Sequence, residues 1–256
     1  MFNSLCSDTY MKYLIILLMS FINCIQANAE NFPDLRIVAT EHNLLQYRID
    51  DEAKGPTAEI TKALLSAIDQ KAIIEFMPWA RAFELTLKRP NTLILSMIRT
   101  PEREKQFHWI GVVSELSRVF ISLKSKPENL ISSDAQAKEK IIAITRGSDS
   151  FTELINRGFS EDKNLYVVTS IEKGYELLLS GKVDLIYYDP NAIRDYIRSN
   201  KLENEVVFNP IKLINRRASY LALSLNSDKK LVELLKSAMA EYQKTEEYRY
   251  WLMKKG

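Results

Sequence analysis

The segment from Arg99 to Glu104 has residue types that could bind a small anion. Thr100 and Pro101 are typical of a helix N-cap and the first helical residue, so the segment predicts a helix start. A cation such as Arg103 is unfavourable at the positive end of a helix. It is better explained by an anionic ligand, because a guanidinium can hold a carboxylate through two parallel hydrogen bonds. The alternative is a helix start whose charges are simply solvated.

A second anion site is indicated between Arg146 and Ser150, after a strand that ends at Ile144. Ser150 and Glu153 have the spacing of a capping box, which predicts a helix N-terminus here. Such an end presents backbone N–H groups to an anion. Asp149 would repel an anion unless its side chain points away, and many helices start this way without binding a ligand.

Asp189 follows a predicted strand and precedes Pro190. In one interpretation Asp189 is the N-cap of a helix that begins at Pro190. In the other it is an acceptor for a ligand, because open α/β sheets bind ligands at the carboxyl ends of their strands. The sequence alone leaves both interpretations open.

Trp79 follows Pro78 in a predicted strand-to-helix turn, in the segment from Met77 to Ala82. A turn of this kind can expose the indole as a platform for the apolar part of a ligand or for a cation. The alternative is a tryptophan that packs in the core or between lobes.

Other chemistry finds little support in the sequence. There is no G-x-G-x-x-G motif, no P-loop and no G-x-S-x-G motif, and the only histidines, His42 and His108, are far apart. We therefore expect no catalytic residue, no metal site and no cofactor. The formal net charge of +2 is close to neutral and argues against nucleic acid as a partner.

The N-terminal segment has the pattern of an export signal. Lys12 precedes an apolar run from Tyr13 to Ile25, and Ala27-Asn28-Ala29 provides a cleavage site. The run is short for a membrane span of roughly 20 residues. We expect a signal peptide over residues 1–29 and a periplasmic protein that begins at Glu30. An uncleaved N-terminal anchor is the alternative, and Met11 is an alternative start.

Both cysteines, Cys6 and Cys24, precede the expected cleavage point. The exported chain would therefore contain no thiol or disulfide, and must be held together by core packing. Asn23 stands where a lipoprotein signal would have a small residue, so lipidation of Cys24 is not expected.

Predicted strands and helices alternate along the chain, which is typical of an α/β protein with largely parallel sheets. The stretch from Lys124 to Lys140 is polar and predicts a surface loop region. Strands are predicted at residues 35–39, 72–76, 92–97, 116–123, 141–144, 165–168, 183–187 and 219–225, and helices at 57–69, 80–87, from 150, 171–179, 190–197 and through most of 228–253.

From Leu35 to Leu252 the chain resembles the family 3 extracellular solute-binding proteins, the receptors of polar amino acid ABC transporters. It resembles a divergent branch of that family. The matching pieces are, in order, Ile37-Val38-Ala39-Thr40-Glu41, Gly55 to Ile60, Pro78-Trp79-Ala80-Arg81-Ala82, Arg99-Thr100-Pro101-Glu102-Arg103, Phe107-His108-Trp109-Ile110-Gly111, Ala143 to Ser148, Gly181-Lys182-Val183-Asp184, and Asp189 with the helix after it.

The resemblance implies a type II periplasmic-binding-protein fold, with two α/β lobes joined by two hinge strands that close on a solute. Lobe 1 would comprise residues 30–113 and 220–256. Lobe 2 would comprise residues 116–215.

The resemblance also implies a role for individual residues. Arg103 would bind the α-carboxylate of an amino acid and Asp189 its α-ammonium. Ser148 would add donors, Trp79 would stack over the ligand, and Glu41 would contact the ligand side chain.

Some positions depart from the family pattern. Ile98 stands where a hydroxyl residue is usual, Leu44 where an aromatic residue is frequent, and Asp149 where a small residue is usual. Arg81 and Arg99 add positive charge that could face the cleft. The pocket could therefore prefer a more acidic or larger polar solute than a standard amino acid.

The leading hypothesis is a monomeric, non-enzymatic periplasmic receptor that passes a small polar, amino-acid-like ligand to a membrane permease or a sensor. The alternatives are a stand-alone ligand sensor and a lyase or dehydratase on the same scaffold. In the enzyme a carboxylate such as that of Glu41 would act as general acid.

Overall fold

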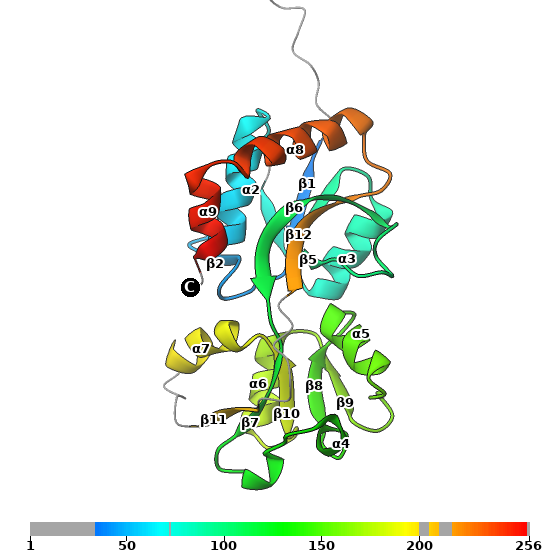
Figure 1. Ribbon diagram of the computed structural model, residues 1–256, viewed down its shortest axis with the longest axis vertical. Helices are drawn as coiled ribbons and strands as arrows, with labels where there is room; N and C mark the ends of the chain where they lie inside the picture. The colour runs from blue at the N-terminus through cyan, green and yellow to red at the C-terminus, as the bar shows by residue number, and fades with distance from the viewer. Residues whose placement is uncertain (1–33, 72, 200–204, 210–216, 255–256) are drawn as a thin grey trace, which may run out of the picture. The chain divides into compact units, whose positions relative to one another are not determined.

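The computed structural model describes residues 34–71, 73–199, 205–209 and 217–254, which form two α/β lobes within one compact unit (Figure 1). The predicted α/β class is confirmed, since helices and strands alternate through both lobes. The export signal expected over residues 1–29 lies outside the described residues.

The first sheet has five strands in the order β4-β1-β5-β12-β6. β1 runs parallel to β4 and β5, and β12 runs antiparallel to β5 and β6. Ile37, Val38 and Ala39 are all fully buried, as expected of a strand covered on both faces. The strands are β1 (Arg36–Ala39), β4 (Ile74–Phe76), β5 (Thr92–Ile98), β6 (Phe107–Leu116) and β12 (Arg217–Ser224).

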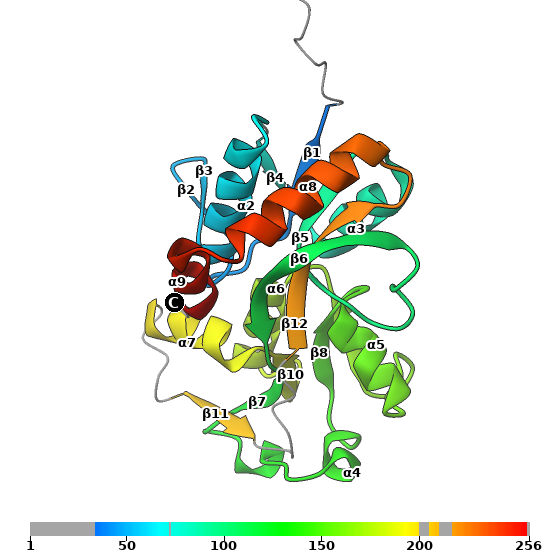
Figure 2. The same cartoon turned by 45° about the horizontal axis from the view of Figure 1, so that its top comes forward.

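Helices cover both faces of this sheet (Figures 1 and 2). On one face, α2 (Pro56–Ala67), α8 (Lys229–Tyr242) and α9 (Glu246–Met253) share an apolar core with the strands, and on the other α3 (Trp79–Lys88) does so. α8 lies very close to β6, since a Cβ atom at Gly111 would be 2.5 Å from Cγ of Met239. A side chain at Gly111 would therefore displace the Met239 side chain from its position against the sheet.

The second sheet has five strands in the order β11-β7-β10-β8-β9. One apolar cluster joins it to α6 and α7, and a second joins it to α4 and α5. The elements are β7 (Val119–Leu123), α4 (Asp134–Ala137), β8 (Ile142–Thr145), α5 (Asp149–Asn156), β9 (Leu165–Val168), α6 (Ile171–Leu179), β10 (Leu185–Tyr188), α7 (Pro190–Ser199) and β11 (Val206–Asn209).

Ser117 and Arg118 connect the two sheets, between the end of β6 and the start of β7. The return connection, residues 210–216, lies outside the described residues. A cluster that contains Leu44, Ile98, Leu116 and Ala192 packs beside the described crossover. Leu44 and Ile98, two departures from the family pattern, thus contribute apolar packing there.

Several predicted elements were wrong in detail. Residues 101–106 form successive turns instead of a helix that starts at Thr100, because β6 begins as early as Phe107 and leaves too little chain. The predicted strand 116–123 is interrupted at the crossover. The helix predicted through most of 228–253 is confirmed as two helices, α8 and α9, with Thr245 as the cap of α9. The predicted loop 124–140 contains α4 and a 3₁₀ turn at Pro127–Asn129.

Four strands were not predicted at all. One is β6, the longest strand described, which runs from Phe107 to Leu116. The others are β11 and the two strands of a hairpin, β2 (Tyr47–Ile49) and β3 (Glu52–Lys54), that precedes α2. Asp50 and Asp51 turn this hairpin with positive φ angles of 48° and 62°, a conformation that Asp tolerates better than most residues.

Candidate functional site

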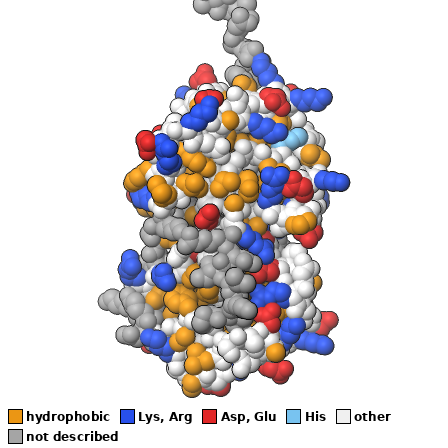
Figure 3. Space-filling model, in the orientation of Figure 1, with side chains coloured by type: hydrophobic (Ala, Val, Ile, Leu, Met, Phe, Trp, Pro, Cys, Tyr) orange, Lys and Arg blue, Asp and Glu red, His pale blue; other side chains and the backbone are white. Residues whose placement is uncertain are grey.

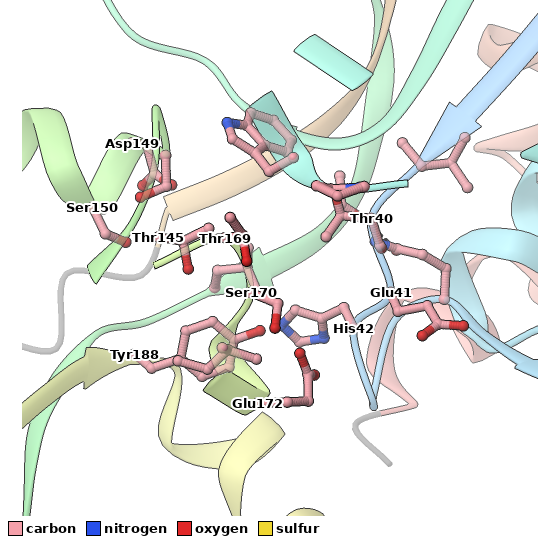
Figure 4. A pocket seen from close by; sticks show the side chains of 18 of the residues that line it. Thr40, Glu41, His42, Thr145, Asp149, Ser150, Thr169, Ser170, Glu172 and Tyr188 are labelled. Carbon is pink, nitrogen blue, oxygen red and sulfur yellow. Dashed lines mark hydrogen bonds between the residues drawn. The ribbon is translucent and has the colours of Figure 1, made fainter. Parts of the chain in front are cut away.

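A cavity of about 400 Å³ is lined by residues of both lobes. Most of its lining comes from segments that follow the carboxyl ends of strands, where open α/β sheets usually bind ligands. The volume suits a small molecule. Figure 4 shows the side chains that converge on it: Thr40, Glu41 and His42 after β1, Thr145, Asp149 and Ser150 around the start of α5, and Thr169, Ser170, Glu172 and Tyr188 around α6 and β10.

Glu41 lies at the edge of this cavity, directly after β1. Its carboxylate accepts a hydrogen bond from Nε of Arg48 at 2.7 Å, and both side chains are about half exposed. Arg48 also lies over the ring of Phe76, 5.5 Å from its centroid. The Glu41 carboxylate therefore lies at the cavity as one half of an ion pair with Arg48, and solvent weakens the electrostatic effect of that pair.

Trp79 lines the cavity at the start of α3. Pro78 precedes the helix and directs the chain into it. The indole Nε1 donates a hydrogen bond to the carbonyl oxygen of Gly147 at 2.8 Å. Since α3 belongs to the first lobe and Gly147 to the second, this bond joins the lobes across one side of the cavity.

Ser148, rather than Ser150, caps α5. The hydroxyl of Ser148 accepts from the backbone N–H of Phe151 at 3.1 Å, so the helix begins at Asp149. The predicted capping box at Ser150 was therefore wrong. Ser150 instead accepts a hydrogen bond from Nε of Arg118 at 2.6 Å. The turn before the helix needs φ of +65° at Gly147, which glycine adopts without strain.

Arg103 is buried beside the cavity and does not line it. Its Nη1 donates to the carbonyl of Ile98 and its Nη2 to the carbonyl of Gly147, both at 3.2 Å. The guanidinium lies 5.5 Å from the ring centroid of Trp79 and 5.0 Å from that of Phe83. Burial lowers the pKa of Arg103, although the Asp149 carboxylate opposes this. Arg103 and Trp79 thus share the Gly147 oxygen.

Asp189 is also buried outside the cavity lining, at the start of α7. Its Oδ1 accepts from the backbone N–H groups of Asn191 at 2.8 Å and Ala192 at 3.2 Å, the pattern of a helix N-cap. Its Oδ2 accepts from the backbone N–H of Ser117 at 2.7 Å and from the Ser117 hydroxyl at 3.3 Å. Asp189 therefore ties the crossover to α7.

Arg99 and Arg81 lie away from the cavity lining. Arg99 makes a two-point contact with Glu104, at 2.7 and 2.5 Å, and lies over the rings of Trp109 and Tyr220. Arg81 is exposed on α3. Of the seven predicted site residues, the structure places Glu41, Trp79 and Ser148 in the lining of one cavity.

Arg118 is the most prominent cavity residue that sequence reasoning missed. Its side chain is 12% exposed and lies on the crossover. Burial opposes its charge, but Asp149 and Asp189 outweigh burial and raise the pKa of Arg118. Arg118 lies near the start of a predicted strand, and a strand pattern does not indicate which residues come together where the chain passes between lobes. The sequence therefore did not identify Arg118 as a cavity residue.

His42 is a second missed residue. Its ring lies 5.7 Å from that of Tyr188, and its Nδ1 accepts from the backbone N–H of Leu44 at 3.4 Å. Burial and then the nearby Arg118 charge lower the pKa of His42 to about 4, although the Asp189 carboxylate opposes this. The imidazole is therefore neutral at pH 7 and offers its Nε2–H as a hydrogen-bond donor.

Ser96 lines the cavity in an unusual backbone conformation, with φ of +57° within β5. Its hydroxyl donates to Oε1 of Gln46 at 2.7 Å, and the Gln46 amide donates to the Thr40 carbonyl at 3.0 Å. A left-handed serine inside a strand is strained, and such residues cluster at binding sites. No sequence pattern predicts this conformation.

Within the described residues, no three His, Cys, Asp or Glu side chains are grouped so that they could hold a metal ion. The helices of that same part of the chain are all too short or too polar to cross a lipid bilayer.

Comparisons with solved structures identify the fold. A histidine kinase sensor domain with similarity to periplasmic binding proteins aligns with a TM-score of 0.73 at 16% identity, covering 85% of this chain and 93% of that one. The chain has the two-lobed periplasmic-binding-protein fold. An ancestral arginine-binding protein bound to arginine gives a TM-score of 0.73 at 18% identity, with 86% and 96% covered.

A third similar structure is an amino acid ABC transporter substrate-binding protein from Streptococcus pneumoniae bound to L-arginine. It aligns with a TM-score of 0.70 at 16% identity, covering 85% of this chain and 92% of that chain. No protein-family model matches the sequence, and a search of curated proteins finds no relative.

Proposed function

We propose that this protein is an exported solute-binding protein that captures a small polar, amino-acid-like ligand between its two lobes for an ABC transporter. The observation that carries the proposal is the cavity of about 400 Å³ lined by residues of both lobes. Closure of two lobes around a solute needs no reaction and no cofactor, and it displays a distinct surface to a partner in the membrane.

The contacts of the cavity residues support this role. Trp79 offers an indole face, Ser148 a capped helix start and Glu41 a carboxylate at the edge. We propose these three as ligand contacts. Arg103 and Asp189 would not contact the ligand. Arg103 would hold the Gly147 turn, and Asp189 would hold the crossover.

Basic and acidic side chains are interspersed over the face shown in Figure 3. On this face such a mixture gives no strong field of one sign, and the formal net charge of the chain is only +2. The charges that bear on ligand choice are therefore those of the cavity.

A ligand sensor is the second candidate, because one of the similar structures is a histidine kinase sensor domain. The ligand-binding step would be the same, and only the partner would differ. Pull-down with a permease or with a sensor kinase, in the presence and absence of ligand, separates the two.

The first test is a thermal-shift screen of the purified protein against amino acids, polyamines, organic acids and small peptides. A ligand at 100 times its Kd stabilises the folded state by about 2.7 kcal/mol, which is a rise in Tm of roughly 5–10 °C for a chain of this size. No rise with any compound would overturn the proposal.

A cavity-filling variant tests the location. Thr145→Phe places a large side chain into the cavity, so it should abolish the shift. Ser180→Phe, at an exposed position at the end of α6, is the matched control and should preserve the shift. An undiminished shift in Thr145→Phe would place the ligand elsewhere.

A further inference from the structure

Arg118 and Arg48 are the two cationic side chains that line the cavity, and they differ in how well they are paired. Arg48 is half exposed and forms a short ion pair with Glu41, at 2.7 Å. Arg118 is 12% exposed, and its carboxylate contacts are long, at 3.4 Å to Asp149 and 4.0 Å to Asp189. Arg118, the more enclosed of the two arginines, therefore has the longer contacts with carboxylates.

The short hydrogen bonds of Arg118 go to neutral groups. Nε donates to the Ser150 hydroxyl at 2.6 Å, and Nη1 donates to the Ser117 carbonyl at 2.8 Å. With the long contact to Asp149, three of the five guanidinium N–H groups have acceptors among the described residues. The other two N–H groups have no acceptor among the described residues and are available to a ligand in the cavity.

The two carboxylates near Arg118, those of Asp189 and Asp149, also contact other groups of the protein. Both oxygens of Asp189 accept hydrogen bonds from backbone N–H groups. Asp149 also faces Arg217, 3.9 Å away. In this arrangement neither carboxylate makes the two-point contact that a guanidinium favours, and Asp189 could do so only by giving up its backbone hydrogen bonds.

One part of the surroundings of Arg118 suits an anionic group of a ligand. The N-terminus of α5, with Ser148, Asp149 and Ser150, lines the same cavity, and the helix dipole there favours negative charge. The Asp149 carboxylate, 3.4 Å from Arg118, opposes a second anion, so the ligand group must approach the guanidinium from another side. Arg103, the arginine that the sequence favours for this task, does not line the cavity and donates to two protein carbonyls.

We propose that Arg118 is the residue that contacts the anionic oxygen group of the ligand, while Arg103 holds the Gly147 turn. This inference rests on the proposed solute-binding function. Because Arg118 is on the crossover, ligand contact there acts directly on the described segment that links the lobes.

Matched ligands test the inference. L-arginine and agmatine differ only in the α-carboxylate, and L-glutamine and 4-aminobutanamide form a second such pair. Binding of all four to wild type, Arg118→Lys and Arg118→Gln would be measured by calorimetry, with Arg89→Gln as the control. Arg89 is exposed at the end of α3, away from the cavity lining.

We expect wild type and Arg89→Gln to prefer the carboxylate member of a pair. Arg118→Gln should lose roughly tenfold to a hundredfold in affinity for that member, as expected for a charge-assisted hydrogen bond, and little for the decarboxylated one. Arg118→Lys keeps a positive charge beside Asp149 and Asp189, so it is the control for a folding defect caused by loss of that charge. It should also lose affinity for the carboxylate member of each pair and keep its affinity for the decarboxylated member.

Two outcomes overturn the inference alone. One is equal affinity of wild type for both members of each pair, and the other is unchanged carboxylate preference in folded Arg118→Gln. Failure of wild type to bind these four compounds and every compound of the thermal-shift screen would instead overturn the proposed solute-binding function, and this inference with it.

Discussion

Trp79 and Gly147 join the two lobes through one hydrogen bond, from the indole Nε1 to the carbonyl oxygen at 2.8 Å. Arg103 donates to the same oxygen at 3.2 Å. A carbonyl of the second lobe thus accepts from two side chains of the first. The Gly147 turn is therefore the point at which closure of the lobes can be weakened by single substitutions.

Trp79→Phe should weaken closure while it keeps an aromatic ring against Phe83. Loss of one hydrogen bond costs about 1 kcal/mol, so the Kd of a ligand found in the thermal-shift screen should rise about fivefold. Small-angle scattering should also show a larger radius of gyration for the unliganded variant. Trp251→Phe is the control, because its Nε1 donates only to exposed Glu247. Unchanged Kd and scattering in Trp79→Phe would show that the bond does not hold the lobes.

Arg103→Met should destabilise the protein even without ligand. It removes two hydrogen bonds from a buried guanidinium and its stacking on Trp79 and Phe83. We expect a loss of about 2 kcal/mol, or a fall in Tm of roughly 4–8 °C. Arg89→Met, at an exposed position, should leave Tm unchanged. An unchanged Tm in Arg103→Met, combined with loss of ligand binding, would favour the direct carboxylate contact that the sequence predicts.

Asp189→Asn should cost more stability than a change at an ordinary helix cap. An amide nitrogen would face N–H groups of Ser117 or Asn191, where a carboxylate oxygen now accepts. We expect a loss of about 1–3 kcal/mol in the free energy of unfolding, measured with urea. Asp228→Asn, where the side chain caps α8 through one bond to Leu231, should cost less. Equal losses at both positions would show that the link to the crossover contributes nothing.

Acid should destabilise the protein through His42. Its pKa is lowered to about 4 in the folded state, so between pH 6.5 and 4 the unfolded chain binds a proton that the folded chain does not. Stability must therefore fall as pH falls through this window, by up to about 3 kcal/mol from this residue.

Urea unfolding at pH 7, 5.5 and 4.5 measures the effect of His42. His42→Gln should flatten the part of the pH dependence that His42 causes. His108→Gln should retain it, since the His108 ring bonds to the Leu225 carbonyl at a different place. An identical pH profile in wild type and His42→Gln would contradict the prediction.

The fold could be predicted from sequence because strand and helix periods are local properties. β1, α2, β5, β8, β9 and α6 were each predicted at or near their observed positions. Around Thr100 the local pattern was misleading, because Thr-Pro is typical of a helix start but the next strand begins too soon for a helix. The predicted helix was one of two reasons to single out Arg103, the other being the family resemblance, and the turns found at residues 101–106 remove the first reason.

The cavity was only partly predictable, because it is made of segments that are distant in the sequence. Trp79 and Glu41 follow predicted strands and lie where such ends should meet. The sequence did not identify Arg118 or His42. The role of Arg118 follows from its place on the crossover, and that of His42 from its burial, and neither property can be read from a local pattern. The strained Ser96 depends on the sheet around it and is equally invisible to a local pattern.

The position of β12 has a consequence for synthesis on the ribosome. β12 lies between β5 and β6, and in the described residues β6 has no other strand as a partner. The first sheet therefore cannot be completed until residues 217–224 have been synthesised, after every described strand of the second sheet. Until then β6 has no described partner and β5 is paired only with β1, so these strand edges stay open to mispairing while the second sheet is already complete.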